Sequence, residues 1–429
     1  MVDSQSFPLH LPSVPRASAG AFHPAATYTP LDIKTIVTAA SLRGIRVVPE
    51  LDLPGHTASW AAGQPNTTVP CSFAVERDPE GFEHGVDGVA LSPTALDSGL
   101  VRAMLTDLGE LFPDNFIHLG GDEVSGDCWA DDEDLVDRAV AMDEGGGPWW
   151  TITLRSYFTA AALDLASQVL GGRQAMLWDE ALELPDLPTL NEEASEQGRH
   201  RGGPLVIQVW RARSYLDMAL SRGLQAVVSQ GFYLDHFEDW QTVYRRGCPA
   251  GDDKPGILGC EACAWAELQD EANLDERLGL KLAASAELFW SRSPVVQSLS
   301  KGYKLKDSAL VKAKRRLAIF RCYLKRQGTQ LGPVMPDFCP TAPIGNASSS
   351  SLAETLSAHD QVPEKSCSAA NRASMVEPEL SREVEELTWK LTQVQEREVS
   401  LKHHLIAANT ALVACLISSV TILVVVVLR

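Results

Sequence analysis

The sequence predicts an α/β fold built around a parallel sheet. Between residues 31 and about 340, helical stretches alternate with short, continuously apolar runs. Such runs are typical of strands that helices cover on both faces. Carboxylates, tryptophans and histidines gather just after these runs, at the carboxyl ends of the expected strands. Because (β/α) barrels carry their catalytic residues at that edge, we expect a pocket there.

The expected elements follow one another in a single βα series. Residues 31–43 have helical periodicity and end at Gly44, after which 44–52 is predicted to be a strand. Further helices are expected near 94–112 and 150–169. The other five strands are expected at 115–119, 174–179, 205–210, 224–229 and 257–263.

The composition changes beyond the predicted globular part, residues 1–342. Residues 343–376 are rich in Ser, Ala, Asn and Pro and predict a disordered linker. Residues 377–404 predict a charged amphipathic helix, either a solvated stalk or a weak coiled coil. Residues 405–428 are apolar or weakly polar throughout, and a helix of that length spans about 36 Å, enough to cross a bilayer. We therefore expect a single-pass membrane protein.

The net charge and the N-terminal residues exclude some classes of protein. The net charge of −19 and a pI of about 5.0 argue against nucleic-acid binding and suit an acidic enzyme. The first residues contain neither a basic start nor an apolar run, so no signal peptide is expected.

The segment from His118 to Val124 carries two adjacent acids, Asp122 and Glu123, after the turn residues Gly120 and Gly121. Adjacent carboxylates repel each other, so we expect their pKa values to differ. One acid can then stay charged while the other keeps its proton, as acid/base catalysis requires. The alternative is a glycine-rich loop with two solvated acids.

Aromatic and polar residues follow the other predicted strands. The tryptophans could stack on the apolar faces of sugar rings, or they could simply pack in the core. Glu50 and Asp52 could form a metal site with His56, but no further His or Cys lies at ligand spacing. We therefore expect no metal and no cofactor. The strand-end candidates are His56, Trp178, Trp210, Tyr233, Asp235, Trp265 and Glu267.

These motifs resemble family 20 of the glycoside hydrolases, and specifically β-N-acetylhexosaminidases of the animal lysosomal type. The resemblance runs from Val2 to about Pro340. It implies a (β/α)8 barrel of the TIM type that lacks its first two strands, in an N-terminally truncated chain with a C-terminal membrane anchor. The segments that carry it are 2–8, 42–50, 52–60, 118–124, 177–180, 208–211, 233–235 and 261–265.

The resemblance implies removal of terminal GlcNAc or GalNAc from glycans by a substrate-assisted mechanism, in which the sugar's own acetamido oxygen attacks the anomeric carbon. Glu123 would be the general acid and later the base, while Asp122 would orient the acetamido N–H. His56 would stand behind Glu123 in a relay that includes Asp3. The remaining roles fall to Tyr233 for the acetamido carbonyl, Trp178, Trp210 and Trp265 for the pocket walls, and Asp235 and Glu267 for sugar hydroxyls.

The alternative function is a catalytically impaired paralogue that binds sugars or a partner protein at a membrane. The resemblance also allows a homo- or heterodimer.

Cysteines and sequons indicate the compartment. Family disulfides would pair Cys71 with Cys128 and Cys322 with Cys339. The sequons at Asn66 and Asn346 would take glycans, and together these features predict a lumenal or extracellular catalytic domain. Cys260 and Cys263 lie on a predicted buried strand, where we expect small apolar fillers.

Overall fold

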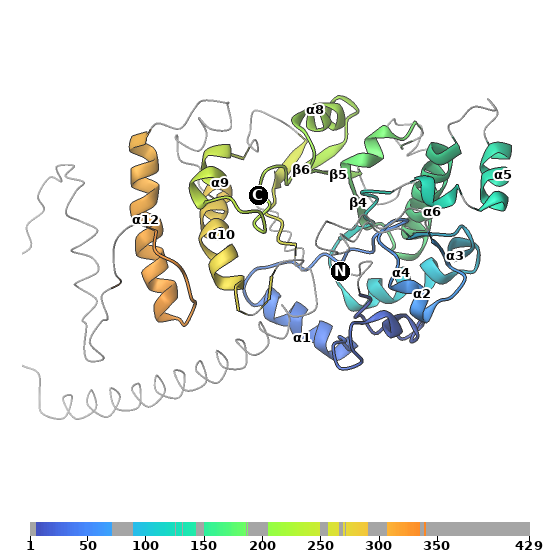
Figure 1. Cartoon of the computed structure of the whole chain (residues 1–429), viewed down its shortest axis with the longest axis horizontal. Coiled ribbons are helices and arrows are strands. Elements are labelled where there is room, and N and C mark those ends of the chain that lie inside the picture. Colours follow the sequence, from blue (N-terminus) through green and yellow to red (C-terminus); the bar gives the residue numbers. More distant parts are fainter. Residues whose placement is uncertain are drawn as a thin grey trace, which may run out of the picture. The chain divides into compact units, whose positions relative to one another are not determined.

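Five parallel strands lie side by side in the order of the sequence in the computed structural model (Figure 1). The strands predicted from residue 115 onward are thus confirmed, and each pairs with the next in parallel register. They are β3 (Phe116–His118), β4 (Gln174–Trp178), β5 (Val206–Val209), β6 (Gln225–Val228) and β7 (Ile257–Cys260). The structure describes residues 6–70, 89–124, 126–130, 132–142, 150–185, 187, 205–248, 256–265, 269–270, 272–290, 307–334 and 339.

The predicted first strand, 44–52, is not a regular strand. It meets β3 through one parallel bridge, between Glu50 and His118, and through hydrogen bonds from Leu51 N to His118 O (2.9 Å) and from His118 N to Pro49 O (3.0 Å). Pro49 has no N–H to extend a ladder. The segment nevertheless lies along the free edge of β3, so Asp52 and His56 reach the carboxyl end of the sheet.

Helices connect the strands, and the three for which the sequence predicted bounds form within a few residues of them. The expected helix at 94–112 is divided into two at Gly99, which has a φ of +77° that side chains rarely adopt. The helices are α1 (Pro30–Ser41), α2 (Trp60–Gly63), α3 (Thr94–Asp97), α4 (Leu100–Leu111), α5 (Glu133–Met142), α6 (Trp150–Val169), α8 (Arg213–Ser221), α9 (Trp240–Arg246), α10 (Leu274–Trp290) and α12 (Asp307–Arg326).

Three 3-10 helices and one small sheet complete the described elements. The 3-10 helices are η1 (Ala17–Gly20), η2 (Gly126–Trp129) and η3 (Asp179–Glu183), and an antiparallel pair is formed by β1 (Thr68–Pro70) and β2 (Val89–Leu91).

Capping residues fix two of the helix starts. Thr29 and Asp32 form a capping box at the start of α1, where Pro30 takes the first turn. Asp239 accepts a hydrogen bond from the backbone N–H of Thr242 at the start of α9. α9 packs on α10, which packs in turn on α12 (Figure 1).

The two faces of the sheet differ in chemistry. Ile117, Leu177 and Ile207 belong to the large apolar cluster that the helices cover. Met176 and Val206 belong to a smaller cluster on the opposite face. Two residues further along, that same face carries buried polar groups, because side chains alternate along a strand. They are His118, Trp178 and Gln208.

The predictions for the C-terminal part lie outside the described residues: the linker 343–376, the helix 377–404 and the span 405–428. The elements above belong to one of two units, and of the other, 335–415, only Cys339 is described. Of the helices that the described residues form, none is both long and apolar enough to cross a bilayer.

Candidate active site

The loop after β3 folds tightly over the segment that contains Asp52. Gly121 N donates a hydrogen bond of 2.8 Å to Oδ1 of Asp52. Gly120 has a φ of +67°, and a Cβ at this position would collide with the Asp52 side chain. Only glycine allows this close approach, which brings the acidic pair beside His56.

The two adjacent acids point into different environments. Asp122 is buried, and its Oδ1 has no hydrogen-bond partner among the described residues. Glu123 has a φ of +51° and a side chain that is 60% exposed. The Asp122 carboxylate is therefore enclosed, while the Glu123 carboxylate faces solvent beyond the carboxyl end of β3.

His56 stands between three carboxylates. Its Nδ1 contacts Oδ2 of Asp52 and lies 3.7 Å from Oδ1 of Asp122. Its Nε2 lies 3.5 Å from Oε2 of Glu123. The structure thus brings together three of the predicted catalytic residues, His56, Asp122 and Glu123, and adds Asp52.

The pKa values of the acidic pair are split, as the sequence predicted, but by a different cause. Burial, and then the neighbouring charge of Asp52, raise the pKa of Asp122 well above its ordinary value. The hydrogen bond with His56 lowers the pKa of Glu123. Burial would lower the pKa of His56, yet Asp52 raises it well above the ordinary value. The expected mutual repulsion of Asp122 and Glu123 is not the cause, because the two side chains meet different surroundings.

A buried ion pair lies at the carboxyl end of β3. Oε1 of Glu50 lies 3.0 Å from Nδ1 of His118 and accepts a hydrogen bond of 3.0 Å from Nε1 of Trp178. Burial raises the pKa of Glu50, but His118 outweighs it and leaves that pKa lowered. Glu50 is therefore engaged away from His56. The sequence groups Glu50 with Asp52 and His56 as possible metal ligands. In the structure Asp122, and not Glu50, lies with Asp52 and His56.

Aromatic rings follow β4, β5 and β6. The rings of Trp178 and Trp265 lie 6.3 Å apart, and those of Trp210 and Tyr233 lie 6.2 Å apart. Trp210 Nε1 donates to both carboxylate oxygens of Glu180, at 3.0 and 3.1 Å. Burial raises the pKa of Glu180 to about 7. Of the three tryptophans predicted to wall the pocket, two thus lie beside each other and the third lies beside Tyr233.

The loop after β6 is held by hydrogen bonds to Trp265 and to Lys281 on α10. Oδ1 of Asp235 accepts a hydrogen bond of 3.3 Å from the backbone N–H of Trp265. Lys281, on α10, donates to the backbone carbonyls of Leu234 and His236. The loop is therefore positioned by the helix behind it.

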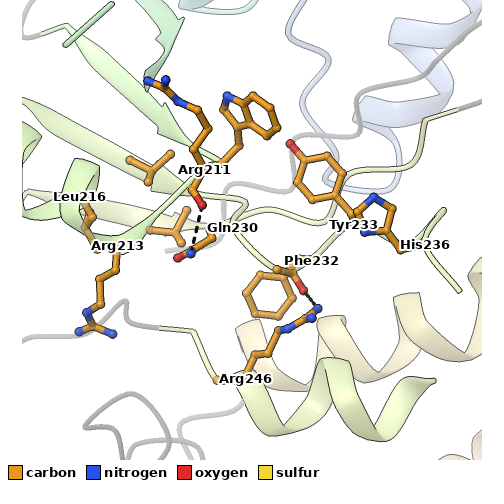
Figure 2. A pocket seen from close by; sticks show the side chains of 13 residues that line it. Arg211, Arg213, Leu216, Gln230, Phe232, Tyr233, His236 and Arg246 are labelled. Carbon is orange, nitrogen blue, oxygen red and sulfur yellow. Dashed lines mark hydrogen bonds between the residues drawn. The ribbon is translucent and has the colours of Figure 1, made fainter. Parts of the chain in front are cut away.

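A pocket of about 740 Å³ adjoins the pair Trp210 and Tyr233. Tyr233 and His236 line it on the side opposite Leu216 and Arg213 (Figure 2). Asp122, Glu123 and His56 are not among its lining residues. The lining of this pocket thus includes two of the predicted substrate-binding residues, Trp210 and Tyr233, but none of the acidic group.

Several predicted residues lie outside the described part of the chain: Asp3, Glu267, Cys71 and Asn346. Asn66 is exposed, as a glycan acceptor must be. Cys128, Cys322 and Cys339 are each disulfide-bonded.

The expectation for Cys260 was wrong. It forms a disulfide with Cys248, across a Cα–Cα distance of 6.0 Å, whereas Cys263 is a buried free thiol as expected. Nothing in the sequence indicates this pairing, which forms only when the end of β7 lies beside the residues after α9.

Sequence reasoning missed most of the supporting carboxylates. The sequence offers Asp52 and Glu50 as possible metal ligands and places Glu180 at the end of a strand, but it assigns none of them a role in catalysis. Glu261 is fully buried, and burial raises its pKa to about 8. One signal could have found them: each lies within two residues of the predicted end of a strand, close to where the catalytic candidates lie.

Comparison with known proteins identifies a family model that matches residues 1–293: "Glycosyl hydrolase family 20, catalytic domain". Curated relatives include the rat β-hexosaminidase subunit beta, 30% identical over 350 residues, and the bovine β-hexosaminidase subunit alpha, 32% identical over 361 residues. Each alignment covers 79% of this chain, but only 58% and 60% of the respective relative. The chain thus spans about three-fifths of the length of these relatives.

Solved structures share the fold. The β-N-acetylhexosaminidase of Bacteroides fragilis aligns with a TM-score of 0.57 and 22% identity, over 79% of this chain and 67% of that one. An exo-β-N-acetylglucosaminidase of Vibrio harveyi aligns with a TM-score of 0.56 and 18% identity, over 78% of this chain and 53% of that one. These similarities support a TIM-type α/β fold.

Proposed function

The chain belongs to glycosyl hydrolase family 20, and we propose that it is a β-N-acetylhexosaminidase that removes terminal GlcNAc or GalNAc from glycans. The names of the curated relatives support this activity.

One observation carries the proposal: a buried carboxylate with a free oxygen lies beside an exposed carboxylate that contacts a histidine. Oδ1 of Asp122 has no partner among the described residues, and a sugar amide N–H could supply one. Glu123 is open to solvent, where a glycosidic oxygen could reach it. The two acids are therefore suited to different parts of one substrate.

In the first step we assign proton donation to Glu123. The acetamido oxygen of the sugar attacks the anomeric carbon, the glycosidic C–O bond breaks, and the leaving oxygen takes the proton of Glu123. Asp122 accepts the acetamido N–H and stabilises the positive charge of the cyclic oxazolinium intermediate. In the second step, water attacks the anomeric carbon and gives a proton to the Glu123 carboxylate, and the ring reopens to the acetamide.

The pKa directions without a sugar run opposite to these roles, since Glu123 must start protonated and Asp122 charged. A bound substrate would reverse both pKa shifts. A bound sugar would cover the exposed Glu123 side chain, and the desolvation would raise its pKa. A hydrogen bond from the acetamido N–H to Asp122 would lower the pKa of that carboxyl.

The aromatic rings supply the remaining contacts in this proposal. The faces of Trp178, Trp210 and Trp265 would pack on the apolar face of the sugar ring, and the Tyr233 hydroxyl would donate to the acetamido carbonyl. The buried hydrogen bond from Trp178 to Glu50 supports this role, because it holds the indole in one orientation.

The deciding experiment measures hydrolysis of an alkyl N-acetyl-β-glucosaminide, whose leaving oxygen needs a proton, by the full chain and by Glu123→Gln. We expect activity in the first and a loss of about 10²–10⁴-fold in the second, the usual contribution of a general acid. Binding of N-acetylglucosamine without any turnover would instead support a sugar-binding paralogue.

We also propose that residues 405–428 anchor the protein in a membrane, with the catalytic part lumenal or extracellular. The apolar composition of that segment supports the anchor, and the disulfide-bonded cysteines support the compartment. Resistance of the full chain to extraction by alkaline carbonate, and its release after deletion of 405–428, would test the anchor.

A further inference from the structure

Asp52, His56 and Asp122 present ligand-type atoms to one another. One atom from each of Asp52, His56 and Asp122 lies within 4.8 Å of the other two. An imidazole and two carboxylates are donors that Zn²⁺ accepts, with a fourth position left open for water. We propose that these residues form a divalent-cation site of the zinc class, and that an ion bound there blocks the candidate active site.

The geometry is close to what the ion requires. Zinc–nitrogen and zinc–oxygen bonds of about 2.0–2.2 Å place tetrahedral ligand atoms about 3.3 Å apart. Nδ1 of His56 lies 3.7 Å from Oδ1 of Asp122. The same Nδ1 contacts Oδ2 of Asp52, so that pair must open slightly to admit the ion.

An independent feature points to a ligand at this place. The Asp122 side chain is only 10% exposed, and its Oδ1, the atom nearest His56, has no hydrogen-bond partner among the described residues. A buried polar atom without a partner is costly, and a bound cation would satisfy it. Within the described part of the chain, His56 is the only cationic side chain paired with Asp52 or Asp122.

The surrounding contacts orient the proposed ligands. Gly121 N holds Oδ1 of Asp52 at 2.8 Å, which leaves Oδ2 directed to His56. Nε2 of His56 faces the Glu123 carboxylate at 3.5 Å, so the ring orientation that exposes Nδ1 is fixed from its other side. Metal-binding histidines commonly have such a carboxylate on the second nitrogen.

Occupancy would remove the groups that the sugar needs. The ion would engage the free oxygen of Asp122 and the imidazole that contacts Glu123, so cation and acetamido group would exclude each other. The inhibition rests on the proposed hydrolase function, whereas binding of the cation does not.

The test titrates Zn²⁺ alone into the full chain, stripped of metal beforehand by a chelator, and follows binding by calorimetry. We expect a site whose affinity falls at least tenfold in Asp122→Asn and in His56→Gln, and also in the presence of saturating N-acetylglucosamine. Glu110→Gln, at an exposed carboxylate on α4, is the matched control: it removes an acid but neither a proposed ligand nor a group that orients one, so zinc binding should stay within about twofold of the unmodified chain.

Two results would overturn the proposal: no zinc binding up to millimolar concentration, or binding that Asp122→Asn and His56→Gln leave unchanged while circular dichroism shows both variants folded. If the chain binds zinc through these residues but does not hydrolyse the glucosaminide, the cation site stands and the proposed function fails. If zinc binds but activity persists at saturation, the inhibitory part fails.

Discussion

Nε2 of His56 lies 3.5 Å from Oε2 of Glu123, while the opposite nitrogen of the same ring contacts Asp52. The imidazole thus connects the loop after β3 with the segment that runs along the free edge of that strand. This contact lowers the pKa of Glu123 through the hydrogen bond with His56. It therefore sets the starting protonation of the candidate acid before any sugar is bound.

The leaving group should determine how much activity Glu123→Gln loses. An alkyl glycoside needs its leaving oxygen protonated, so we expect kcat to fall about 10²–10⁴-fold. An aryl glycoside with an acidic phenol needs little protonation, and its bond-breaking step should lose much less. Single-turnover kinetics on both substrates measure this difference. Glu110→Gln, an exposed carboxylate on α4, is the control; equal losses on both substrates would contradict an acid role for Glu123.

Gly120→Ala should be far more damaging than Gly171→Ala. Both glycines have a positive φ, +67° and +62°, so both variants incur the strain of a left-handed alanine, roughly 1–2 kcal/mol. Only at Gly120 would the new Cβ also collide with Asp52, whereas nothing lies within 4 Å at Gly171. Urea unfolding should show a larger loss for Gly120→Ala, together with loss of activity. Equal destabilisation would mean that Asp52 moves aside freely.

Glu261→Gln should flatten the pH dependence of stability. Burial raises the pKa of Glu261 from its ordinary 4.5 to about 8, so the folded chain keeps a proton that the unfolded chain has lost. The free energy of unfolding should therefore fall as pH rises from about 4.5 to 8, by up to about 1.4 kcal/mol per unit from this group. Unfolding curves at pH 5, 6, 7 and 8 measure the slope. If the free energy of unfolding falls as steeply with pH in Glu261→Gln as in the unmodified chain, other groups cause the pH dependence.

Replacing Cys248 and Cys260 together by serine should destabilise the fold. A disulfide that closes a loop of this length, with a sequence separation of 12, contributes about 3 kcal/mol in the chain-entropy estimate. Thermal unfolding with and without reductant tests it: the unmodified chain should lose stability on reduction more than the double variant does. Cys263→Ser, at the free thiol, serves as the control.

Much of the fold could be predicted because its signals are local. The apolar runs of β3 to β7 and the helical periodicity of α1 and α6 belong to short stretches of sequence, and the structure forms them within a few residues of the predicted bounds. The prediction of a strand at 44–52 was wrong because an apolar run indicates only that a strand could form. Whether it pairs depends on a neighbour elsewhere in the chain and on prolines within it.

The candidate site, like the fold, has features that the sequence determines and features that depend on tertiary contacts. The sequence by itself determined that Asp122, Glu123, His56 and the tryptophans follow strand ends, since that placement depends only on where each apolar run stops. Only the tertiary structure decided that Asp52 rather than Glu50 contacts His56, that Glu50 pairs with His118 instead, and that Asp122 is buried while Glu123 is exposed. Burial and charge contacts set these pKa values, and both arise between segments far apart in the chain, such as Asp52 and Gly121, 69 residues from each other.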